Sequence, residues 1–222
     1  MDKDLLSIQQ VRDLLKAAKT AQAIYAEFTQ EQVDKVVEAM SMEVRKYAEK
    51  LAKMANEETG FGKWQDKVIK NKFAAEIVYE SIKGMKTIGI LGEKDSVMDV
   101  AVPVGVVAGL IPSTNPTSTV IYKTLISLKA GNGIIISPHP NAKKCIIETV
   151  EILKRAAYGA GAPEGLIGVI EIPTMEATAE LMKHKDTALI LATGGEAMVR
   201  AAYSSGTPAI GVGPGNGPAY IE

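Results

Sequence analysis

Four short loops in the second half of the chain have the composition of nucleotide-binding loops. All are rich in Gly, Pro, Ser, Thr and Asn, and they span residues 112–116, 137–140, 193–195 and 213–217. Such loops present backbone N–H groups and small hydroxyls to a phosphate or a ribose, especially where a helix N-terminus follows. Each loop alone is equally consistent with an ordinary turn. Their recurrence after four apolar segments is what favours ligand binding.

The glycines of the last loop do not complete a known phosphate-binding signature. Residues 213–217 read Gly-X-Gly-X-Gly, whereas the dinucleotide fingerprint is Gly-X-Gly-X-X-Gly and the phosphate-binding loop ends in Gly-Lys-Ser/Thr. The case for a nucleotide therefore depends on where the loops lie in the fold.

Short apolar runs that alternate with helical segments position these loops. The runs are typical of strands buried on both faces of a parallel sheet, and they cover residues 104–111, 133–136, 166–170, 187–191 and 208–212. Helices are predicted over residues 117–129, 142–158 and 176–183, and after Gly195 as far as Tyr203. We therefore predict an α/β fold, a Rossmann-like parallel sheet whose carboxyl edge carries the four loops.

The first 103 residues have a different pattern, which predicts helices followed by a β-hairpin. Helical periodicity covers residues 4–23, about 29–60 and 64–83. Thr29 and Gln32 form a capping box at the start of the second helix. Two short β-like runs, at residues 87–91 and 96–102, predict the hairpin. We expect residues 1–103 to form this region and residues 104–222 to form the Rossmann-like region.

The composition is that of a globular protein with no strongly charged surface. Of the 222 residues, 46% are hydrophobic, and the formal net charge is -1, which gives no reason to expect a nucleic-acid or anionic-membrane partner. No stretch approaches the roughly 20 apolar residues that span a bilayer, and the charged N-terminus resembles no targeting signal. A single cysteine excludes a disulfide within the chain. We expect a soluble cytoplasmic protein.

Several segments together resemble a known family. They are VGVVAGLIPSTNPTSTVIYKTLISLKAGNGIIISPHPNAKK at residues 104–144, LATGG at 191–195 and AAYSSGTPAIGVGPGN at 201–216, with FTQEQVDKVVEAM and DKVIKNKFAAE nearer the N-terminus. They strongly resemble CoA-acylating aldehyde dehydrogenases, above all the N-terminal half of the bifunctional aldehyde-alcohol dehydrogenases. The resemblance covers essentially the whole chain. Acylating enzymes for succinate semialdehyde or sulfoacetaldehyde are also similar, so these two aldehydes are alternative substrates.

The resemblance implies a reaction and its partners. An aldehyde, acetaldehyde above all, reacts reversibly with coenzyme A and NAD to give acyl-CoA and NADH. A cysteine thiolate adds to the aldehyde, hydride passes to the nicotinamide, and CoA rather than water takes the acyl group. The intact enzyme is expected to be a homo-oligomer that needs no metal. Residues 104–222 are then the NAD-binding region, and residues 1–103 belong to the cofactor-binding and oligomerisation region.

The resemblance also assigns site residues, one position at a time. The first loop gives Leu110, Ile111, Pro112, Ser113, Thr114 and Asn115; the adenosine side gives Ser137, Pro138 and His139; the nicotinamide side gives Thr193, Gly194, Gly195 and Gly213. Asn115 matches the side-chain amide that donates to the developing oxyanion, a contact worth about 3 kcal/mol when preorganised. Taken by itself, Asn115 is better explained as a turn residue before Pro116, and only the motif around it favours the functional role. Ser137 stands where hydrolytic relatives have a lysine, so no charge contact to the ribose is expected there.

Two absences refine the expected reaction. Hydrolytic aldehyde dehydrogenases have a glutamate that activates water where this chain has Gly211, and no acidic residue lies between residues 207 and 221. Without that base, the thioester is left for a thiol acceptor. The family's catalytic cysteine lies downstream of the residues 213–217 loop, in a catalytic domain absent from these 222 residues.

Cys145 is not expected to replace the missing nucleophile. Lys143 and Lys144 lie beside it and some thiolate stabilisation is conceivable, but it has no evident His partner and lies away from Asn115. We interpret Cys145 as a structural residue and expect the chain alone to be inactive. The alternatives are an inactive assembly or nucleotide-binding module, or an unrelated Rossmann-type protein, which the set of motifs disfavours.

Overall fold

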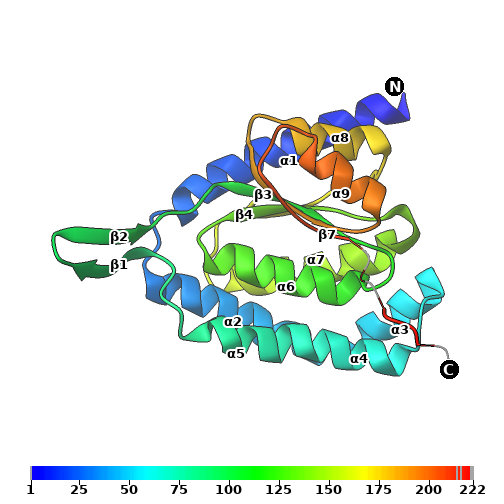
Figure 1. The fold of residues 1–222 in the computed structure, drawn as a ribbon, viewed down its shortest axis with the longest axis horizontal. Coiled ribbons are helices and arrows are strands. Elements are labelled where there is room, and N and C mark those ends of the chain that lie inside the picture. Colours follow the sequence, from blue (N-terminus) through cyan, green and yellow to red (C-terminus); the bar gives the residue numbers. More distant parts are fainter. Residues whose placement is uncertain (1, 214, 216, 221–222) are drawn as a thin grey trace.

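Five parallel strands form the central sheet, as the sequence predicts (Figure 1). The computed structural model describes residues 2–213, 215 and 217–220. The strands are β3 (Val106–Leu110), β4 (Gly133–Ser137), β5 (Ile167–Val169), β6 (Thr187–Thr193) and β7 (Ala209–Val212), in the order β5-β4-β3-β6-β7. Every residue of β3, β4 and β5 is buried, which explains their continuous apolar sequences. The topological switch point lies between β3 and β6, because the chain continues to β4 on one side of β3 and returns with β6 on the other.

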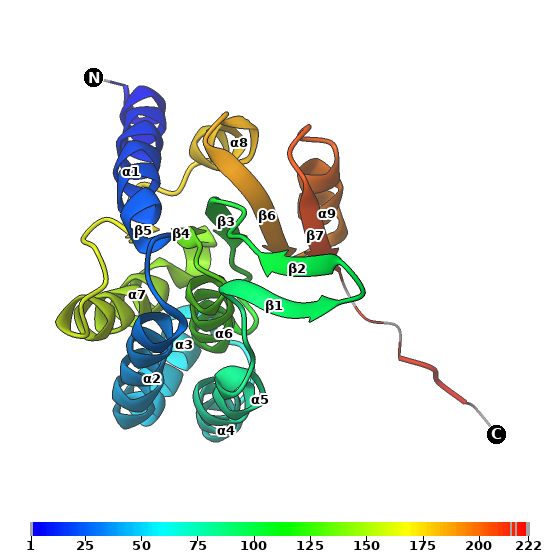
Figure 2. The ribbon, with the colours of Figure 1, turned by 90° about the vertical axis from the view of Figure 1, so that its left-hand side faces the viewer.

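Helices cover both faces of the sheet (Figures 1 and 2). One face carries α1 (Lys3–Tyr25), α8 (Met175–Lys183) and α9 (Glu196–Tyr203). The other face carries α6 (Pro116–Lys129) and α7 (Lys143–Gly159), and a short 3-10 turn, Pro140–Ala142, precedes α7. The core divides accordingly. Ile134 and Ile136 of β4 pack into the cluster beneath α6 and α7, whereas Ile135 points into the cluster beneath α1 and α8. The predicted Rossmann-like fold is therefore confirmed.

A further layer of helices lies outside α6 and α7, and its first part differs from the prediction. The layer contains α2 (Gln30–Lys46), α3 (Ala48–Thr59), α4 (Trp64–Lys72) and α5 (Val78–Lys83). The capping box is confirmed: Thr29 N–H donates to Gln32 Oε1 at 2.8 Å, and Gln32 N–H donates to Thr29 Oγ1 at 3.4 Å. The prediction of one continuous helix to Gly60 is wrong, because Tyr47 leaves helical geometry at φ -102° and ψ 5°. A break of one residue hardly changes the helical spacing of the apolar residues, so the sequence does not indicate it.

The predicted helix 64–83 contains a π-helical segment, Phe73–Ile77, between α4 and α5. A π-turn frees backbone carbonyls from the regular helical pattern. Here the carbonyl of Ala75 accepts a hydrogen bond from Ser41 Oγ at 2.7 Å and another from Arg45 Nη2 at 3.3 Å. The local sequence does not predict the irregularity because side chains of α2 satisfy that carbonyl.

The predicted hairpin is present and projects from the body of the molecule (Figures 1 and 2). Strands β1 (Gly89–Lys94) and β2 (Val97–Ala101) pair antiparallel. The prediction that residues 92–95 form the turn is wrong in its position, because β1 continues to Lys94. Asp95 and Ser96 form the turn with positive φ values of 49° and 71°. The hairpin exposes the apolar side chains Ile90, Leu91, Val97, Met98 and Val100.

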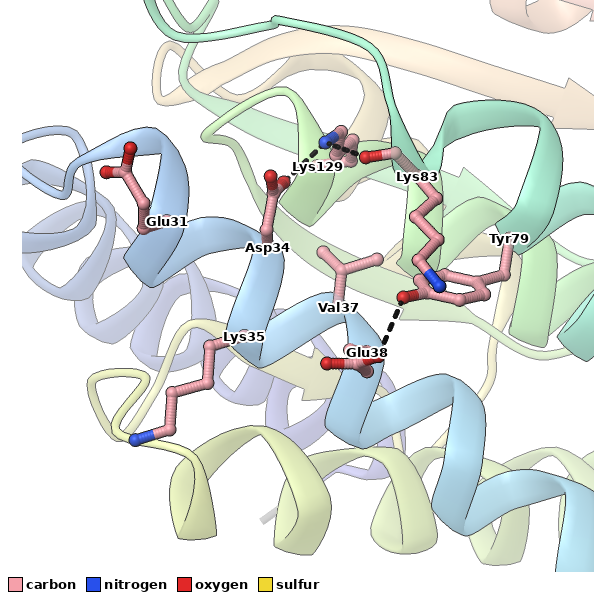
Figure 3. A pocket seen from close by; sticks show the side chains of 8 residues that line it. All are labelled: Glu31, Asp34, Lys35, Val37, Glu38, Tyr79, Lys83 and Lys129. Atoms are coloured by element: carbon pink, nitrogen blue, oxygen red, sulfur yellow. Dashed lines mark hydrogen bonds and ion pairs between the residues drawn. The ribbon is translucent and has the colours of Figure 1, made fainter.

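A polar cluster joins α2, α5 and α6 around a small cavity of about 370 Å³ (Figure 3). Lys129 is buried there, where its ammonium forms an ion pair with Asp34 and donates to the carbonyl of Lys83 at 3.2 Å. Tyr79 Oη donates to Glu38 Oε1 at 3.3 Å, and burial together with Glu38 raises the pKa of Tyr79 to about 12. These contacts satisfy a buried cation and connect three helices, so we interpret the cluster as structural.

Among the described residues, no helix is long and apolar enough to cross a membrane.

Candidate functional site

Three of the four predicted loops meet at one pocket. It has a volume of about 630 Å³ and lies at the carboxyl ends of β3, β4 and β6, beside the switch point. The predicted residues that line it are Leu110, Ile111, Pro112, Ser137, Pro138, His139, Thr193, Gly194 and Gly195. The structure therefore brings together loops that are far apart in the sequence.

The walls of the pocket come from α8 and α9, which the sequence analysis did not assign to the site. Their lining residues are mostly small or apolar and include Met175, Ala179, Met182, Ala197, Met198 and Ala201. α9 begins after Gly195 without a side-chain cap, and the N–H groups of Glu196 and Ala197 in its first turn have no acceptor among the described residues, whereas Met198 N–H donates to the carbonyl of Gly195. An apolar pocket beside backbone N–H donors suits a ligand that has a flat aromatic ring linked to anionic groups such as phosphates. The order of strands and helices in the sequence could have predicted this, because α8 and α9 are the helices next to β6 in the chain.

The polar side chains that line the pocket include Ser137, Thr178 and His139, and Lys183 of α8 adds a cationic side chain to the lining. Ser137 is buried, and its hydroxyl lies 3.0 Å from Thr178 Oγ1 of α8. His139 uses Nδ1 to accept a hydrogen bond from Asn141 N–H at 3.1 Å. The neutral ring then carries its proton on Nε2, which is the atom left to contact a ligand.

The rest of the first loop faces α4 and does not line the pocket. Asn115 is the N-cap residue of α6, yet its side chain makes no capping hydrogen bond. Instead its Oδ1 accepts from Lys70 Nζ at 2.8 Å. The side chain therefore does not perform the capping function common for a turn asparagine. Ser113 and Thr114 also lie outside the pocket lining.

The fourth loop contributes nothing to this pocket among the residues that the structure describes. Gly213 follows β7, is exposed and does not line the pocket. Residues 214 and 216 of the same loop lie outside the described residues. The assignment of Gly213 to the cofactor site stays a prediction.

A buried lysine that the sequence analysis did not select lies at the switch point. The Lys123 side chain of α6 is almost completely buried, and its Nζ donates to the carbonyls of Leu110 at 2.8 Å and Leu191 at 2.7 Å. Leu110 ends β3 and Leu191 lies on β6, so the amine joins the two strands that the switch point separates. Burial lowers the pKa of Lys123 to about 7. The signal in the sequence was a lysine within the predicted helix 117–129, shortly after the apolar residues Val120 and Ile121.

Comparison with known proteins decides the family. A model described as the aldehyde dehydrogenase family matches residues 5–211. The chain belongs to the aldehyde dehydrogenase family. It is 50% identical over 218 residues to the bifunctional aldehyde-alcohol dehydrogenase AdhE of Escherichia coli, with 97% of this chain and 24% of that protein covered. It is 42% identical to the succinate-semialdehyde dehydrogenase (acetylating) of Clostridium kluyveri, with 96% and 47% covered.

Solved structures of aldehyde dehydrogenases have the same fold. A probable aldehyde dehydrogenase from Listeria monocytogenes is 65% identical, with a TM-score of 0.97 over 98% of this chain and 49% of that chain. An acetylating aldehyde dehydrogenase from Geobacillus thermoglucosidasius is 58% identical, with a TM-score of 0.95 over 97% and 48%. The resemblance to acylating members of the family is thus confirmed. The chain spans about half the length of these solved relatives and about a quarter of the bifunctional one.

Gly211, where hydrolytic aldehyde dehydrogenases are expected to have a glutamate, has no room for a side chain. A Cβ atom at Gly211 would lie 2.7 Å from Val199 Cγ1 and 2.9 Å from Tyr203 Cε2. The N–H of Gly211 donates to Tyr203 Oη at 2.9 Å. α9 therefore packs directly against β7 at this position, and a glutamate would require the side chains of Val199 and Tyr203 to move.

The single cysteine has none of the features of an aldehyde dehydrogenase nucleophile. Cys145 is fully buried, and its thiol donates to the carbonyl of Ala142 at 3.3 Å. Burial, reinforced by Glu58, raises its pKa well above the ordinary value. Glu58 of α3 instead caps α7, because its two carboxylate oxygens accept from the N–H groups of Lys144 and Cys145 at 2.7 and 2.8 Å. The conceivable stabilisation of the thiolate by neighbouring lysines is therefore not found.

Proposed function

We propose that the full-length protein catalyses the NAD-dependent, CoA-acylating oxidation of a short aldehyde, reversibly, and that this chain provides the cofactor-binding part. The observation that carries the proposal is the pocket at the switch point, where three loops assigned to NAD meet in a chain of the acylating type. Structures of relatives support coenzyme A and a nicotinamide cofactor as ligands. A propionaldehyde dehydrogenase from Rhodopseudomonas palustris has bound CoA, and an engineered glycolyl-CoA reductase has bound NADP+.

The residues present fit a nicotinamide dinucleotide. The apolar walls of α8 and α9 suit the adenine ring, and Ser137 with Thr178 offers hydroxyls on the floor. The uncapped first turn of α9 and the small Gly194 and Gly195 allow the backbone to approach a pyrophosphate closely. NAD, when bound, accepts the hydride that leaves the aldehyde carbon. In this proposal Asn115 donates its amide N–H to the oxygen that becomes negatively charged.

Acetaldehyde is the substrate that we favour, because the chain matches the bifunctional AdhE enzymes at 50% identity. Succinate semialdehyde and sulfoacetaldehyde are the alternatives, because acylating dehydrogenases named for them are 42% and 45% identical. We further propose that residues 1–103 contribute to assembly, since the hairpin exposes an apolar surface suited to a homo-oligomer. The division of the chain after residue 103 is part of this proposal. An inactive nucleotide-binding or assembly module remains the alternative class.

Purified full-length protein, incubated with acetaldehyde and NAD, is expected to form NADH and acetyl-CoA only when CoA is present. The physical reason is the packing of α9 at Gly211, which leaves no space for a side chain that activates water. Product analysis by mass spectrometry, repeated with the two alternative aldehydes, ranks the substrates. Cys145→Ser should leave the rate unchanged. Acetate formed at a similar rate without CoA would overturn the acyl-transfer proposal, and absence of turnover with all three aldehydes would favour the inactive module.

A further inference from the structure

Helix α4 contacts the first loop through two of its side chains and the start of α6 through a third, although it lies outside the strand-helix units that build the sheet. Lys67 Nζ donates to the carbonyl of Thr114 at 2.7 Å, and Lys70 Nζ donates to Asn115 Oδ1 at 2.8 Å. Asn71 accepts from Thr117 Oγ1 at 2.7 Å and donates to the carbonyl of Ala48 at 3.0 Å. The three α4 residues are spaced i, i+3 and i+4, so they lie on one face of the helix.

We infer that Lys70 is a positioning residue that fixes the direction of the Asn115 side-chain amide. An ammonium group carries only donors, so Lys70 can bind the amide oxygen but not the amide nitrogen. With Oδ1 held by Lys70, Nδ2 and its two protons point to the opposite side of the amide. No hydrogen bond between described residues has Nδ2 as its donor, so in this inference its protons serve a substrate oxygen. The inference rests on the proposed function, in which that amide donates to the oxyanion.

The charge of Lys70 also strengthens the amide as a donor. A cation bound to the amide oxygen withdraws electron density from the nitrogen, and hydrogen bonds in such a chain reinforce one another. Lys67 adds a second cation next to it. Burial and then the charge of Lys70 lower the pKa of Lys67. Lys67 holds the backbone of the loop while Lys70 holds the side chain at its end.

The contribution of Lys70 to folding should be small, because its side chain is exposed and a single surface contact stabilises little. Its effect should appear in the chemical step. Without the lysine, the amide rotates between two orientations, and only one presents its N–H groups to the substrate. We expect Lys70→Met to lower kcat of the full-length enzyme about tenfold, the scale of one oriented, charge-assisted hydrogen bond, and to leave KM for NAD within about twofold.

Matched variants separate this role from a general effect of charge. Lys72→Met removes an exposed lysine from the same helix and should leave kcat unchanged. Lys70→Arg keeps a cationic donor and should restore most of the rate. In an Asn115→Ala background, Lys70→Met should have no further effect, because the group it positions is gone. An equal loss of kcat in both backgrounds overturns the inference.

A spectroscopic readout tests the positioning independently of activity. The Asn115 ¹³Cγ resonance, assigned by its disappearance in Asn115→Ala, reports the hydrogen bond to Oδ1. It should move upfield in Lys70→Met and stay in place in Lys72→Met. If Asn115→Ala retains full activity, the proposed oxyanion function fails, while the ¹³Cγ shift still decides whether Lys70 holds the amide. An unchanged ¹³Cγ resonance in Lys70→Met overturns the inference.

Discussion

Asn115→Ala is expected to lower kcat of the full-length enzyme by about a hundredfold or more, with little change in KM for NAD. Removing one preorganised oxyanion donor typically costs two to three orders of magnitude in kcat. The structure orients the donor, because Lys70 holds Oδ1 and no hydrogen bond between described residues has Nδ2 as its donor. Steady-state kinetics with acetaldehyde and CoA measure the effect.

Protein stability provides the first control for this prediction. The Asn115 side chain makes no capping hydrogen bond, so Asn115→Ala should change the free energy of unfolding by less than about 0.5 kcal/mol. Asn141→Ala, at an exposed asparagine near the adenosine-side loop, should leave kcat unchanged. A loss of less than about threefold in Asn115→Ala would be too small for an oxyanion donor and would contradict the assignment.

Lys123→Met is expected to lower the free energy of unfolding by about 2–3 kcal/mol at pH 9. Methionine fills a similar space but removes the donor that the carbonyls of Leu110 and Leu191 share. A buried acceptor without a partner costs about 1–3 kcal/mol. A neutral lysine amine has two N–H groups, which match the two carbonyls. Urea unfolding followed by circular dichroism measures the loss, and Lys16→Met, at an exposed lysine of α1, is the surface control.

The effect should depend on pH with a definite sign. The pKa of Lys123 is lowered to about 7 in the folded state, whereas the unfolded lysine stays protonated to about 10.5. Between these values the unfolded state binds more protons, so the contribution of Lys123 to stability rises with pH, by at most about 1.4 kcal/mol per pH unit. The difference between wild type and Lys123→Met should therefore be larger at pH 9 than at pH 6.5. The same difference at both pH values would show that the amine is not neutral in the fold.

Local pattern was sufficient to predict the parallel sheet. The continuous apolar runs are buried on both faces, and the loops that follow them lie at one edge, so three of them meet in the pocket. The capping box at Thr29 and the presence of a hairpin are equally local and were also found, although the turn is centred later than the predicted residues 92–95. Such features depend on residues that are close in sequence, or on a run of apolar residues that recurs in each strand.

The features that were missed depend on contacts between distant segments. The π-turn at Ala75 is stabilised by Ser41, and Lys123 is a buried donor whose two acceptor carbonyls come from strands that are distant in the sequence. The contact of Lys70 with Asn115 joins a helix outside the sheet to a loop at its edge. None of these partners has a fixed spacing in the sequence, so no pattern in a single chain identifies them.

Titration of the ¹⁵N-labelled 222-residue chain with NAD, followed by NMR, tests most directly whether the pocket at the switch point is the dinucleotide site. Binding is expected to be weak, with shifts that cluster at the backbone amides of Ile111, Ser137, His139, Thr193, Gly194 and Gly195. Ala201→Trp, which places a large side chain in the pocket, should abolish those shifts. Unchanged spectra at saturating NAD, or shifts confined to the hairpin or to the cluster around Lys129, would contradict the account.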